Sequence, residues 1–256
     1  MSAKKPTLLQ VIVHVGGWLP LALIVSDYFT HRLTANPIQA IEQRTGIQAL
    51  TFLLLSLACT PLSSILGWRE LTKRRKALGN YGFLYASIHV LTFIGLDYAF
   101  NFMSILRDVG TKWYILIGLL AFLLLVPLAF TSFKYWMKRL GKNWKRLHWL
   151  AYIISPLVAL HFLLSVKGDL TRLQGNILQP LLYGSVALIL LILRISTIKV
   201  GLMRLRTKLE SRLRNMIPSG NPPTKNQAVP IPNREVDHLA DRSRFKARDD
   251  QHKSRD

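Results

Sequence analysis

The sequence has little cysteine and little negative charge. It contains one cysteine, Cys59, and 13 acidic residues against 34 lysines and arginines, for a net charge of +21. A single cysteine excludes a disulfide framework or a cysteine-based metal site within the chain. Such a basic balance would indicate nucleic acid for a soluble protein. Here the charges lie between apolar blocks and in the C-terminal part, so we attribute them to a membrane and predict no nucleic-acid partner.

Other familiar signals are also missing. We find no internal repeat, no glycine-rich phosphate loop and no soluble nucleotide-binding domain. The last absence argues against a self-contained reductase with its own flavin and nicotinamide module. The N-terminal apolar stretch has no A-x-A-like cleavage site and is long enough to span a bilayer, so we interpret it as a membrane segment rather than a signal peptide.

Half of the residues are hydrophobic, and they occur in blocks of about twenty with few charges. That is the length a helix needs to cross about 30 Å of hydrocarbon at about 1.5 Å per residue. The sequence therefore predicts an all-α integral membrane protein, a six-transmembrane-helix bundle within residues 1–200. The predicted spans are 8–25, 47–66, 81–100, 113–130, 147–166 and 177–195.

The connecting segments alternate in charge. Residues 68–76 hold five positive charges and one negative, and residues 134–146 hold six positive charges and no acid. The other three connections, 27–44, 101–112 and 167–176, are close to neutral. Since lysine and arginine stay on the cytoplasmic side, we predict a multi-pass protein with both termini in the cytoplasm.

Residues 201–256 differ from the rest in being polar, proline-rich and mixed in charge. They are too polar to bury a core, which predicts a basic, disordered cytoplasmic tail. Its basic residues are expected either to contact anionic membrane lipid, at roughly 1 kcal/mol per residue near the surface, or to remain simply solvated.

Three histidines fall within or at the edge of predicted spans: His89, His148 and His161. Histidine is costly in lipid, and neutral imidazole is a common axial ligand of haem iron. A lone membrane histidine can also simply bond a neighbouring helix. From the cytoplasmic ends of their spans, His89 lies about 15 Å deep, His161 about 20 Å and His148 a couple of ångströms. We therefore predict that His89 and His161 clamp one haem between two helices.

His148 is more open to interpretation. Its place at the cytoplasmic edge suits a second haem, a quinone or the headgroup region. Pro156 lies between His148 and His161 and can alter the helix phase, so the spacing does not decide whether both face one cavity. Arg75 and its basic neighbours satisfy the positive-inside rule without further function, or pair with haem propionates or a flavin phosphate. His14 is expected to be structural or solvated.

At these residues the chain resembles a known family, the haem-binding membrane subunits of the bacterial periplasmic protein-methionine-sulfoxide reductase system (MsrQ type), within the ferric-reductase-like transmembrane group. The resemblance extends over roughly residues 18–195 and rests on the order and spacing of short stretches. These are Leu33-Thr34-Ala35-Asn36-Pro37 with Thr45-Gly46, Ala58-Cys59-Thr60-Pro61-Leu62, Arg74-Arg75-Lys76-Ala77-Leu78-Gly79, Phe83-x-Tyr85-x-x-x-His89, Leu96-Asp97, Leu128-Ala129-Phe130-Thr131-Ser132, and Trp144-Lys145-Arg146-Leu147-His148-x-Leu150-x-Tyr152 running to His161.

The resemblance implies a subunit in the bacterial cytoplasmic (inner) membrane that takes electrons from the quinone pool or from a cytoplasmic flavin reductase. It implies transfer through haem b to a periplasmic molybdopterin-containing catalytic subunit, which reduces methionine sulfoxide in oxidised proteins. His89, His148 and His161 match the family's histidine positions, which makes them the candidate haem-iron ligands. FMN is associated with the family, although no phosphate-binding motif in this sequence supports it independently.

Two alternatives remain open at this stage. One is a cytochrome b or ferric reductase with another electron acceptor. The other is a small proton-coupled transporter in which the buried histidines relay protons. In the function that the resemblance implies, the chain is an electron-transfer subunit, and the reduction of methionine sulfoxide takes place on the partner.

Overall fold

A computed structural model describes residues 6–166, 168–169, 174–175, 177–194 and 207–208. Its helices are α1 (Leu8–Phe29), α2 (Pro37–Leu66), α3 (Glu70–Thr92) continued by a π-helical turn η1 (Phe93–Asp97), α4 (Phe102–Thr111), α5 (Trp113–Phe130), α6 (Lys134–Leu140), α7 (Lys142–Leu147), a 3₁₀ turn η2 (His148–Leu150), α8 (Ala151–Ser165) and α9 (Leu178–Ile192). Two short strands, β1 (Gly168–Asp169) and β2 (Gln174–Gly175), pair antiparallel. Apart from residues 207 and 208, the predicted tail lies outside the described residues.

Local capping explains where α2 begins and ends. The Asn36 side chain accepts a hydrogen bond from the Gln39 N–H at 3.2 Å, and Pro37 occupies the first helical position. Both residues favour a helix start. Gly67 ends the helix with a φ of 71°, a conformation that suits glycine. The predicted start at residue 47 was therefore wrong by ten residues, since the hydropathy pattern marks the apolar segment and not the polar turns that extend it.

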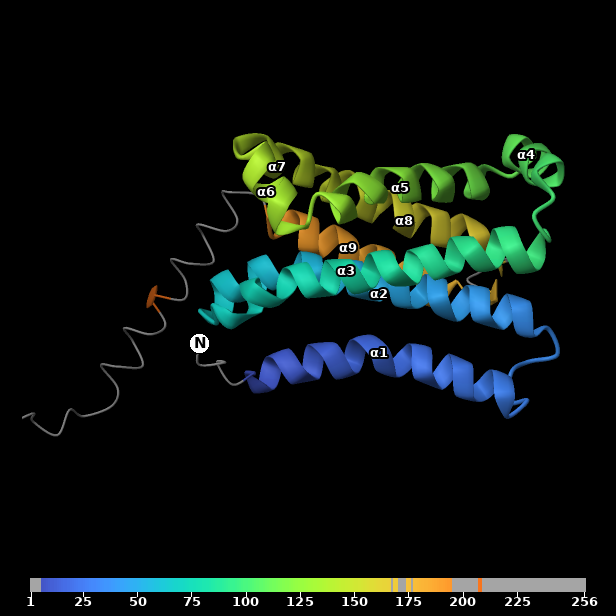
Figure 1. The fold of residues 1–256 in the computed structure, drawn as a ribbon, viewed down its shortest axis with the longest axis horizontal. Helices are drawn as coiled ribbons and strands as arrows, with labels where there is room; N and C mark the ends of the chain where they lie inside the picture. The colour runs from blue at the N-terminus through green and yellow to red at the C-terminus, as the bar shows by residue number, and fades with distance from the viewer. Residues whose placement is uncertain (1–5, 167, 170–173, 176, 195–206, 209–256) are drawn as a thin grey trace, which may run out of the picture. The chain divides into compact units, whose positions relative to one another are not determined.

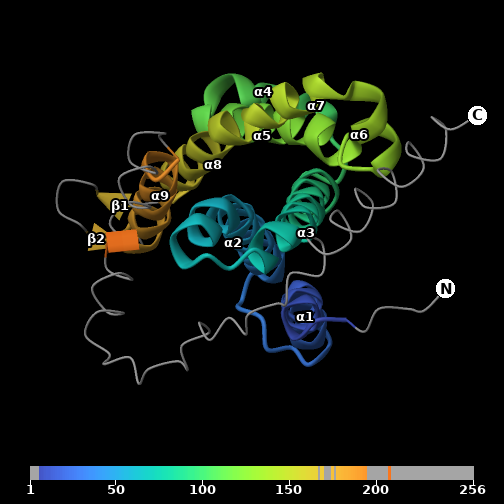
Figure 2. The same cartoon turned by 90° about the vertical axis from the view of Figure 1, so that its left-hand side faces the viewer.

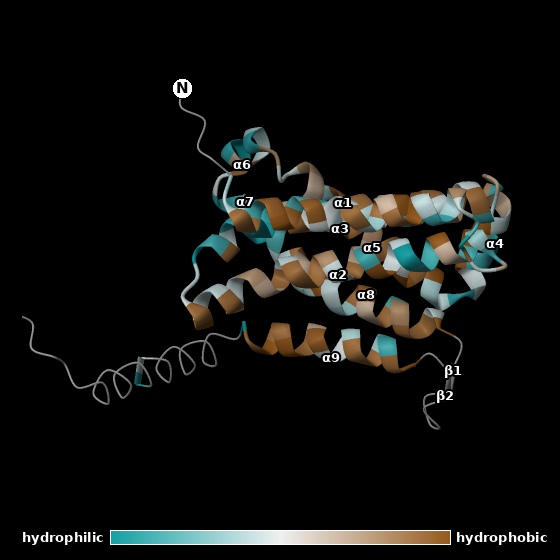
Figure 3. Cartoon of the chain, turned by 90° about the horizontal axis from the view of Figure 1, so that it is seen from below, coloured by the Kyte–Doolittle hydropathy of each residue, from teal (hydrophilic) through white to brown (hydrophobic). Residues whose placement is uncertain are grey.

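The helix α3 begins at Glu70, so most of the first basic segment is helical and not a loop. In the described residues, five helical segments are long and apolar enough to cross a membrane: Leu8–Phe29, Pro37–Leu66, Glu70–Asp97, Trp113–Phe130 and Lys142–Ser165. Apolar residues predominate along these helices, and hydrophilic residues gather toward the two ends, at α6 and α7 and around α4 (Figure 3). The sixth predicted span appears as the 15-residue helix α9, which is shorter than a usual span. Six spans and a cytoplasmic location of the termini remain predictions.

The helices lie side by side along one direction (Figure 1). The basic helices α6 and α7 lie at one end of this bundle, together with the start of α3, and we call it the basic end. The helix α4 lies at the other, which we call the opposite end. Seen along the helices, α2 and α3 form the centre, with α1 on one side and α5 and α8 on the other (Figure 2).

Two pairs of helices make the closest contacts, α2 with α3 and α5 with α8. Each pair is antiparallel, and we call them the first and the second hairpin. The hairpins meet reciprocally, because α2 contacts α8 while α3 contacts α5. A buried cluster that includes Leu50, Leu54 and Leu57 of α2 joins α8 and α9 to the centre.

The helix α1 is attached to α3 by two tyrosines. The hydroxyl of Tyr85, which is fully buried, donates to the Gly17 carbonyl at 2.8 Å and accepts from the Leu21 N–H at 2.9 Å. It thus stands within the backbone ladder of α1, next to Pro20, and satisfies both groups. The Tyr81 hydroxyl lies 2.9 Å from Nδ1 of His14. His14 therefore contributes to helix packing.

Candidate functional site

His89 of α3 and His161 of α8 face each other across the boundary between the two hairpins. Their ring centroids are 6.2 Å apart and the rings are inclined at 77°. Depth along the predicted spans had matched these two histidines, and the structure brings them together. Both rings are partly buried among the helices.

Each ring is held by a backbone carbonyl of the other helix in its own hairpin. Nδ1 of His89 lies 2.9 Å from the carbonyl oxygen of Glu42, and Nδ1 of His161 lies 2.7 Å from that of Tyr114. A carbonyl oxygen only accepts, so Nδ1 carries the proton in both rings. In the neutral imidazole this leaves Nε2 with a free lone pair, the arrangement typical of a metal-ligating histidine.

A glycine makes each of these contacts possible. Gly46 follows Glu42 by four residues, and Gly118 follows Tyr114 by four. Helical side chains lean toward the N-terminus, so a side chain at either glycine would cover the carbonyl one turn earlier. A Cβ at Gly46 would stand 3.2 Å from Nδ1 of His89, and a Cβ at Gly118 would stand 2.7 Å from Nδ1 of His161. The two glycines therefore give the imidazoles access to the helix backbone.

The spacing of the rings fits an iron atom between them. An iron–nitrogen bond of about 2 Å and about 1.1 Å from ring nitrogen to centroid give centroids roughly 6 Å apart for two axial imidazoles. Among the described residues, no group of three or more His, Cys, Asp and Glu side chains gathers around one point. A bare zinc ion needs three or four protein ligands, whereas haem brings its own equatorial nitrogens and needs two. The pair suits haem.

The two hairpins repeat one arrangement. The histidine follows its carbonyl partner by 47 residues in each hairpin. Glu42, Gly46 and His89 correspond to Tyr114, Gly118 and His161 at a constant offset of 72 positions. The sequence shows no internal repeat, and the similarity of the two hairpins becomes visible only in the structure. Only the glycine and the histidine are identical in the two sets, and the carbonyl belongs to the backbone, so the signal is too sparse for sequence comparison.

A pocket of about 270 Å³ lies at the basic end, between the hairpins. Its lining includes His148, Arg75, Lys76 and Trp144, with apolar walls from residues such as Leu125. Nδ1 of His148 lies 3.1 Å from the Trp144 carbonyl oxygen, and the two rings are 4.1 Å apart. His148 therefore belongs to this pocket rather than to the pair formed by His89 and His161.

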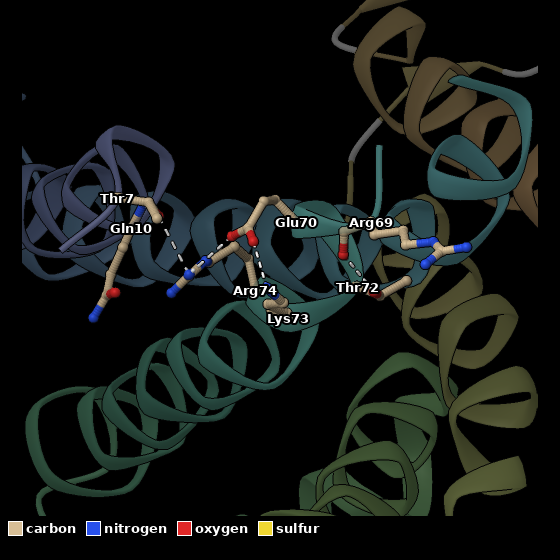
Figure 4. Close-up of polar contacts among 7 residues, drawn as sticks. All are labelled: Thr7, Gln10, Arg69, Glu70, Thr72, Lys73 and Arg74. Carbon is tan, nitrogen blue, oxygen red and sulfur yellow. Dashed lines mark hydrogen bonds and ion pairs between the residues drawn. The ribbon is translucent and has the colours of Figure 1, made fainter. Parts of the chain in front are cut away.

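The neighbours Arg74 and Arg75 have different surroundings. Arg74 contacts Glu70 and the Thr7 hydroxyl, each at 3.3 Å, and so links α3 to the start of α1 (Figure 4). Arg75 lines the pocket, and its guanidinium makes no hydrogen bond or ion pair with the residues that the structure describes. Of the two arginines, Arg75 is the one available to an anionic ligand.

Comparison with known proteins is consistent with this geometry. Residues 45–159 match the family described as "Ferric reductase like transmembrane component". The chain is 38% identical over 188 residues to the "Protein-methionine-sulfoxide reductase heme-binding subunit MsrQ" of Xanthomonas euvesicatoria pv. vesicatoria, covering 71% of this chain and 83% of that protein. The protein of the same name from Herminiimonas arsenicoxydans is 36% identical over 195 residues, covering 76% and 87%. No solved structure matches the chain.

Proposed function

Because the chain belongs to the MsrQ family of haem-binding subunits, within the ferric-reductase-like transmembrane group, we propose that it is a membrane electron-transfer subunit with haem b bound by His89 and His161. The observation that supports this most strongly is the matched pair of imidazoles, each oriented by a carbonyl and spaced for one iron. Haem supplies reversible one-electron chemistry at iron. The residues supply axial ligation, fixed ring orientation and an apolar surround.

The basic end is the proposed entry point for electrons, on the cytoplasmic side of the bacterial inner membrane. The donor is quinol or a cytoplasmic flavin reductase. We assign FMN to the basic-end pocket, with Arg75 on the phosphate and His148 beside the ring system. The pocket volume of about 270 Å³ is close to the lower end of known ligand sites, which hold about 300–1,000 Å³. Its apolar walls suit a ring, and its cations suit a phosphate.

The opposite end is the proposed exit. The acceptor is a periplasmic molybdopterin-containing methionine-sulfoxide reductase, on which the reduction of methionine sulfoxide takes place. The names of the relatives refer to a protein-methionine-sulfoxide reductase, without giving its cofactor or its compartment. The family description also fits a second function, a ferric reductase with another acceptor, because it is the ferric-reductase component that residues 45–159 match.

The visible spectrum of the purified protein tests the haem assignment. The wild-type protein in detergent, expressed with adequate haem supply, should show a Soret band and the α-band of b-type haem. His89→Ala and His161→Ala should each remove or severely reduce both bands, since an axial ligand is lost. A full spectrum in either variant contradicts this pair, and a wild-type protein without a Soret band contradicts electron transfer through haem.

Arg75→Ala and Arg74→Ala form a matched pair for the pocket assignment. Quenching of flavin fluorescence during FMN titration should reveal binding to the wild-type protein. Loss of a charge-assisted contact worth about 1.5–3 kcal/mol should weaken binding by Arg75→Ala about tenfold or more. Arg74→Ala should leave it nearly unchanged. Equal effects of the two variants would mean that general charge, and not the pocket, attracts the flavin.

To identify the acceptor, reduced wild-type protein in nanodiscs is mixed with the periplasmic reductase, or with ferric citrate. Rapid haem reoxidation by the reductase alone supports the proposed partner. Reoxidation by ferric citrate alone supports the second function.

A further inference from the structure

The carbonyl that orients His89 has a second side-chain partner. The Glu42 carbonyl oxygen lies 2.9 Å from Nδ1 of His89, and the Thr45 hydroxyl lies 3.0 Å from the same oxygen. The hydroxyl also lies 2.7 Å from the Ile41 carbonyl oxygen, so its single proton is shared between two carbonyls in a three-centre bond. Thr45 is fully buried, at 0% exposure, so bulk water does not replace these contacts.

The second hairpin lacks this hydroxyl. At the offset of 72 positions that relates the two histidine sites, Thr45 corresponds to Ile117, whose side chain has no donor. Both carbonyls also face the backbone N–H four residues later in their helices, so the threonine hydroxyl is the donor that distinguishes them. Nδ1 of His161 lies 2.7 Å from the Tyr114 carbonyl oxygen, whereas the corresponding distance at His89 is 2.9 Å. The two imidazoles are therefore held by hydrogen bonds of different length.

The strength of this hydrogen bond affects how well an imidazole donates to a metal. When Nδ1–H donates to an oxygen, the ring gains negative character and Nε2 becomes a more basic ligand. An oxygen that accepts from a further donor offers less negative charge to the imidazole. A less basic axial ligand favours ferrous over ferric iron, because the ferric ion carries the higher charge. The Thr45 hydroxyl thus lowers the basicity of His89 and leaves that of His161 unchanged.

We propose that Thr45 is a positioning residue that raises the redox potential of the haem, because its hydroxyl draws on the Glu42 carbonyl and makes His89 a weaker ligand than His161. The inference rests on the proposed function, since it needs haem bound by these two histidines. It goes beyond that function in assigning unequal strength to the two ligands. Thr45 acts through the backbone of α2 and through the His89 ring, and a haem that is easier to reduce accepts electrons from a weaker donor.

The substitution Thr45→Val removes the hydroxyl and keeps nearly the same shape. The carbonyls of Ile41 and Glu42 keep their helical hydrogen bonds, so no buried group loses its only partner. The haem is titrated with redox mediators in nanodiscs while the α-band is recorded. The equilibrium constant for haem reduction should fall about two- to fivefold, as expected for part of one hydrogen bond, which is a shift of about 20–40 mV at about 59 mV per tenfold.

A spectroscopic signature and a conservative variant accompany this measurement. The near-infrared charge-transfer band of the ferric haem, recorded by magnetic circular dichroism, should move to higher energy in Thr45→Val. The reason is that a more basic imidazole raises the iron orbital that receives the electron. Thr45→Ser keeps the hydroxyl and should have the wild-type potential and the wild-type band.

Two further variants separate the shared carbonyl from packing. Ile117→Thr places a hydroxyl three residues after Tyr114, as Thr45 stands three residues after Glu42, and it should raise the potential by a similar amount. Thr92→Val is the matched control. Thr92 is also buried and lies three residues after His89, but its hydroxyl donates to the Ile88 carbonyl, at 2.9 Å, and this carbonyl orients neither histidine. This variant should keep the wild-type potential.

Three results overturn the proposal. The first is a Thr45→Val variant with full haem content and the wild-type potential. The second is an equal shift in Thr92→Val, because packing near His89 would then set the potential. The third applies even if Thr45→Val loses its haem, and it is an unchanged or lowered potential in Ile117→Thr. A wild-type protein without haem is a different failure, because it refutes the proposed function itself.

Discussion

The two hairpins hold their histidines in the same way but differ at the basic end. Near the opposite end, each hairpin contributes one histidine, one carbonyl and one glycine in the same register. At the basic end, the first hairpin contributes Arg75 and Lys76, where the segment that leads into α8 has Leu147 and His148. The hairpins are alike where both would contact one symmetric object, an iron atom. They differ where the pocket would receive an asymmetric molecule with one charged end.

A second difference lies in how tightly the rings are held. The ring of His161 packs so closely on α5 that a Cβ at Gly118 would meet it at 2.7 Å, whereas the corresponding distance at Gly46 and His89 is 3.2 Å. Real Cβ contacts under 3.0 Å essentially never occur, so a side chain at Gly118 would displace its histidine ring further than a side chain at Gly46 would. The two hairpins therefore hold their histidines in the same arrangement but pack them at different distances, and alanine at each glycine should reveal this difference.

Among substitutions that leave both histidines in place, Gly118→Ala should reduce haem retention most. The added methyl group must displace the His161 ring from the Tyr114 carbonyl, and overpacking of this kind costs about 1–3 kcal/mol. That corresponds to roughly 5- to 150-fold weaker haem retention. Haem per polypeptide after a wash with apomyoglobin as acceptor measures it. The matched control is Gly184→Ala in α9, where a Cβ would meet nothing within 4 Å. Equal haem retention in the two variants would show that the glycine does not set the ring position.

Sequence patterns predicted the apolar part of the helices well, including both ends of α5, and missed the polar starts of α2 and α3. Five of the predicted spans are confirmed as helices that are long and apolar enough to cross a membrane. The starts of α2 and α3 were missed by about ten residues. The helix α2 extends beyond its apolar segment because Asn36 caps it, whereas α3 begins without a side-chain cap. The cap signals were present in the sequence, at Asn36-Pro37, and a reading of caps beside hydropathy would have found them.

The sequence was sufficient to predict the two histidines of the candidate site, but not the carbonyls and glycines that orient their rings. Depth within the spans was sufficient to match His89 with His161, since both lie on helices that start at the basic end of the bundle. The carbonyls of Glu42 and Tyr114 have no sequence signature, because every residue has a carbonyl. Gly46 and Gly118 are visible, but a membrane helix contains glycines for many reasons. Only the packing of α2 on α3 and of α5 on α8 distinguishes these two.

Gly46→Ala should have a smaller effect than Gly118→Ala. At 3.2 Å the His89 ring needs to move by only a few tenths of an ångström, and we expect a cost of less than about 1 kcal/mol. The variant should retain most of its haem and show a small shift of the α-band, since the imidazole orientation changes. Haem-retention assays run in parallel on Gly46→Ala and Gly118→Ala measure how much more haem the second variant loses. A loss at Gly46 as large as that at Gly118 would contradict the inequality of the two hairpins.

The smallest effect is expected from a substitution in the connection between the hairpins, at the opposite end, where it should alter local stability and not haem retention. There the Tyr98 hydroxyl donates to the Asp108 carboxylate, and Nζ of Lys112 lies 2.6 Å from the same carboxylate. Hydrogen bonds from Lys112 and Tyr98 lower the pKa of Asp108, the bond to Asp108 raises the pKa of Lys112, and burial together with the bond to Asp108 raises the pKa of Tyr98 to about 12.

These directions fix the pH range in which α4 is held. A lowered carboxyl pKa contributes stability above the unfolded value of about 3.9, and the contribution is lost as pH falls through the folded pKa. The raised pKa values of Lys112 and Tyr98 contribute below about pH 10, and this is lost as pH rises through the folded values. Protection of α4 amides against hydrogen–deuterium exchange, corrected for intrinsic rates, should therefore be constant from about pH 7 to pH 5 and fall as pH is lowered below about 4.

Asp108→Asn should lower this protection at pH 7 by about two- to fivefold, as expected for an exposed ion pair, and should weaken its dependence on acid pH. Asp97→Asn is the control, because the Asp97 carboxyl makes no hydrogen bond or ion pair with the described residues. Haem retention should be the same in both variants and in the wild type, since the contacts of the two histidines lie within the hairpins and not in their connection. A loss of haem in Asp108→Asn would mean that α4 helps to set the distance between the hairpins. The similarity of their two histidine sites would then depend on this connection as well as on Gly46 and Gly118.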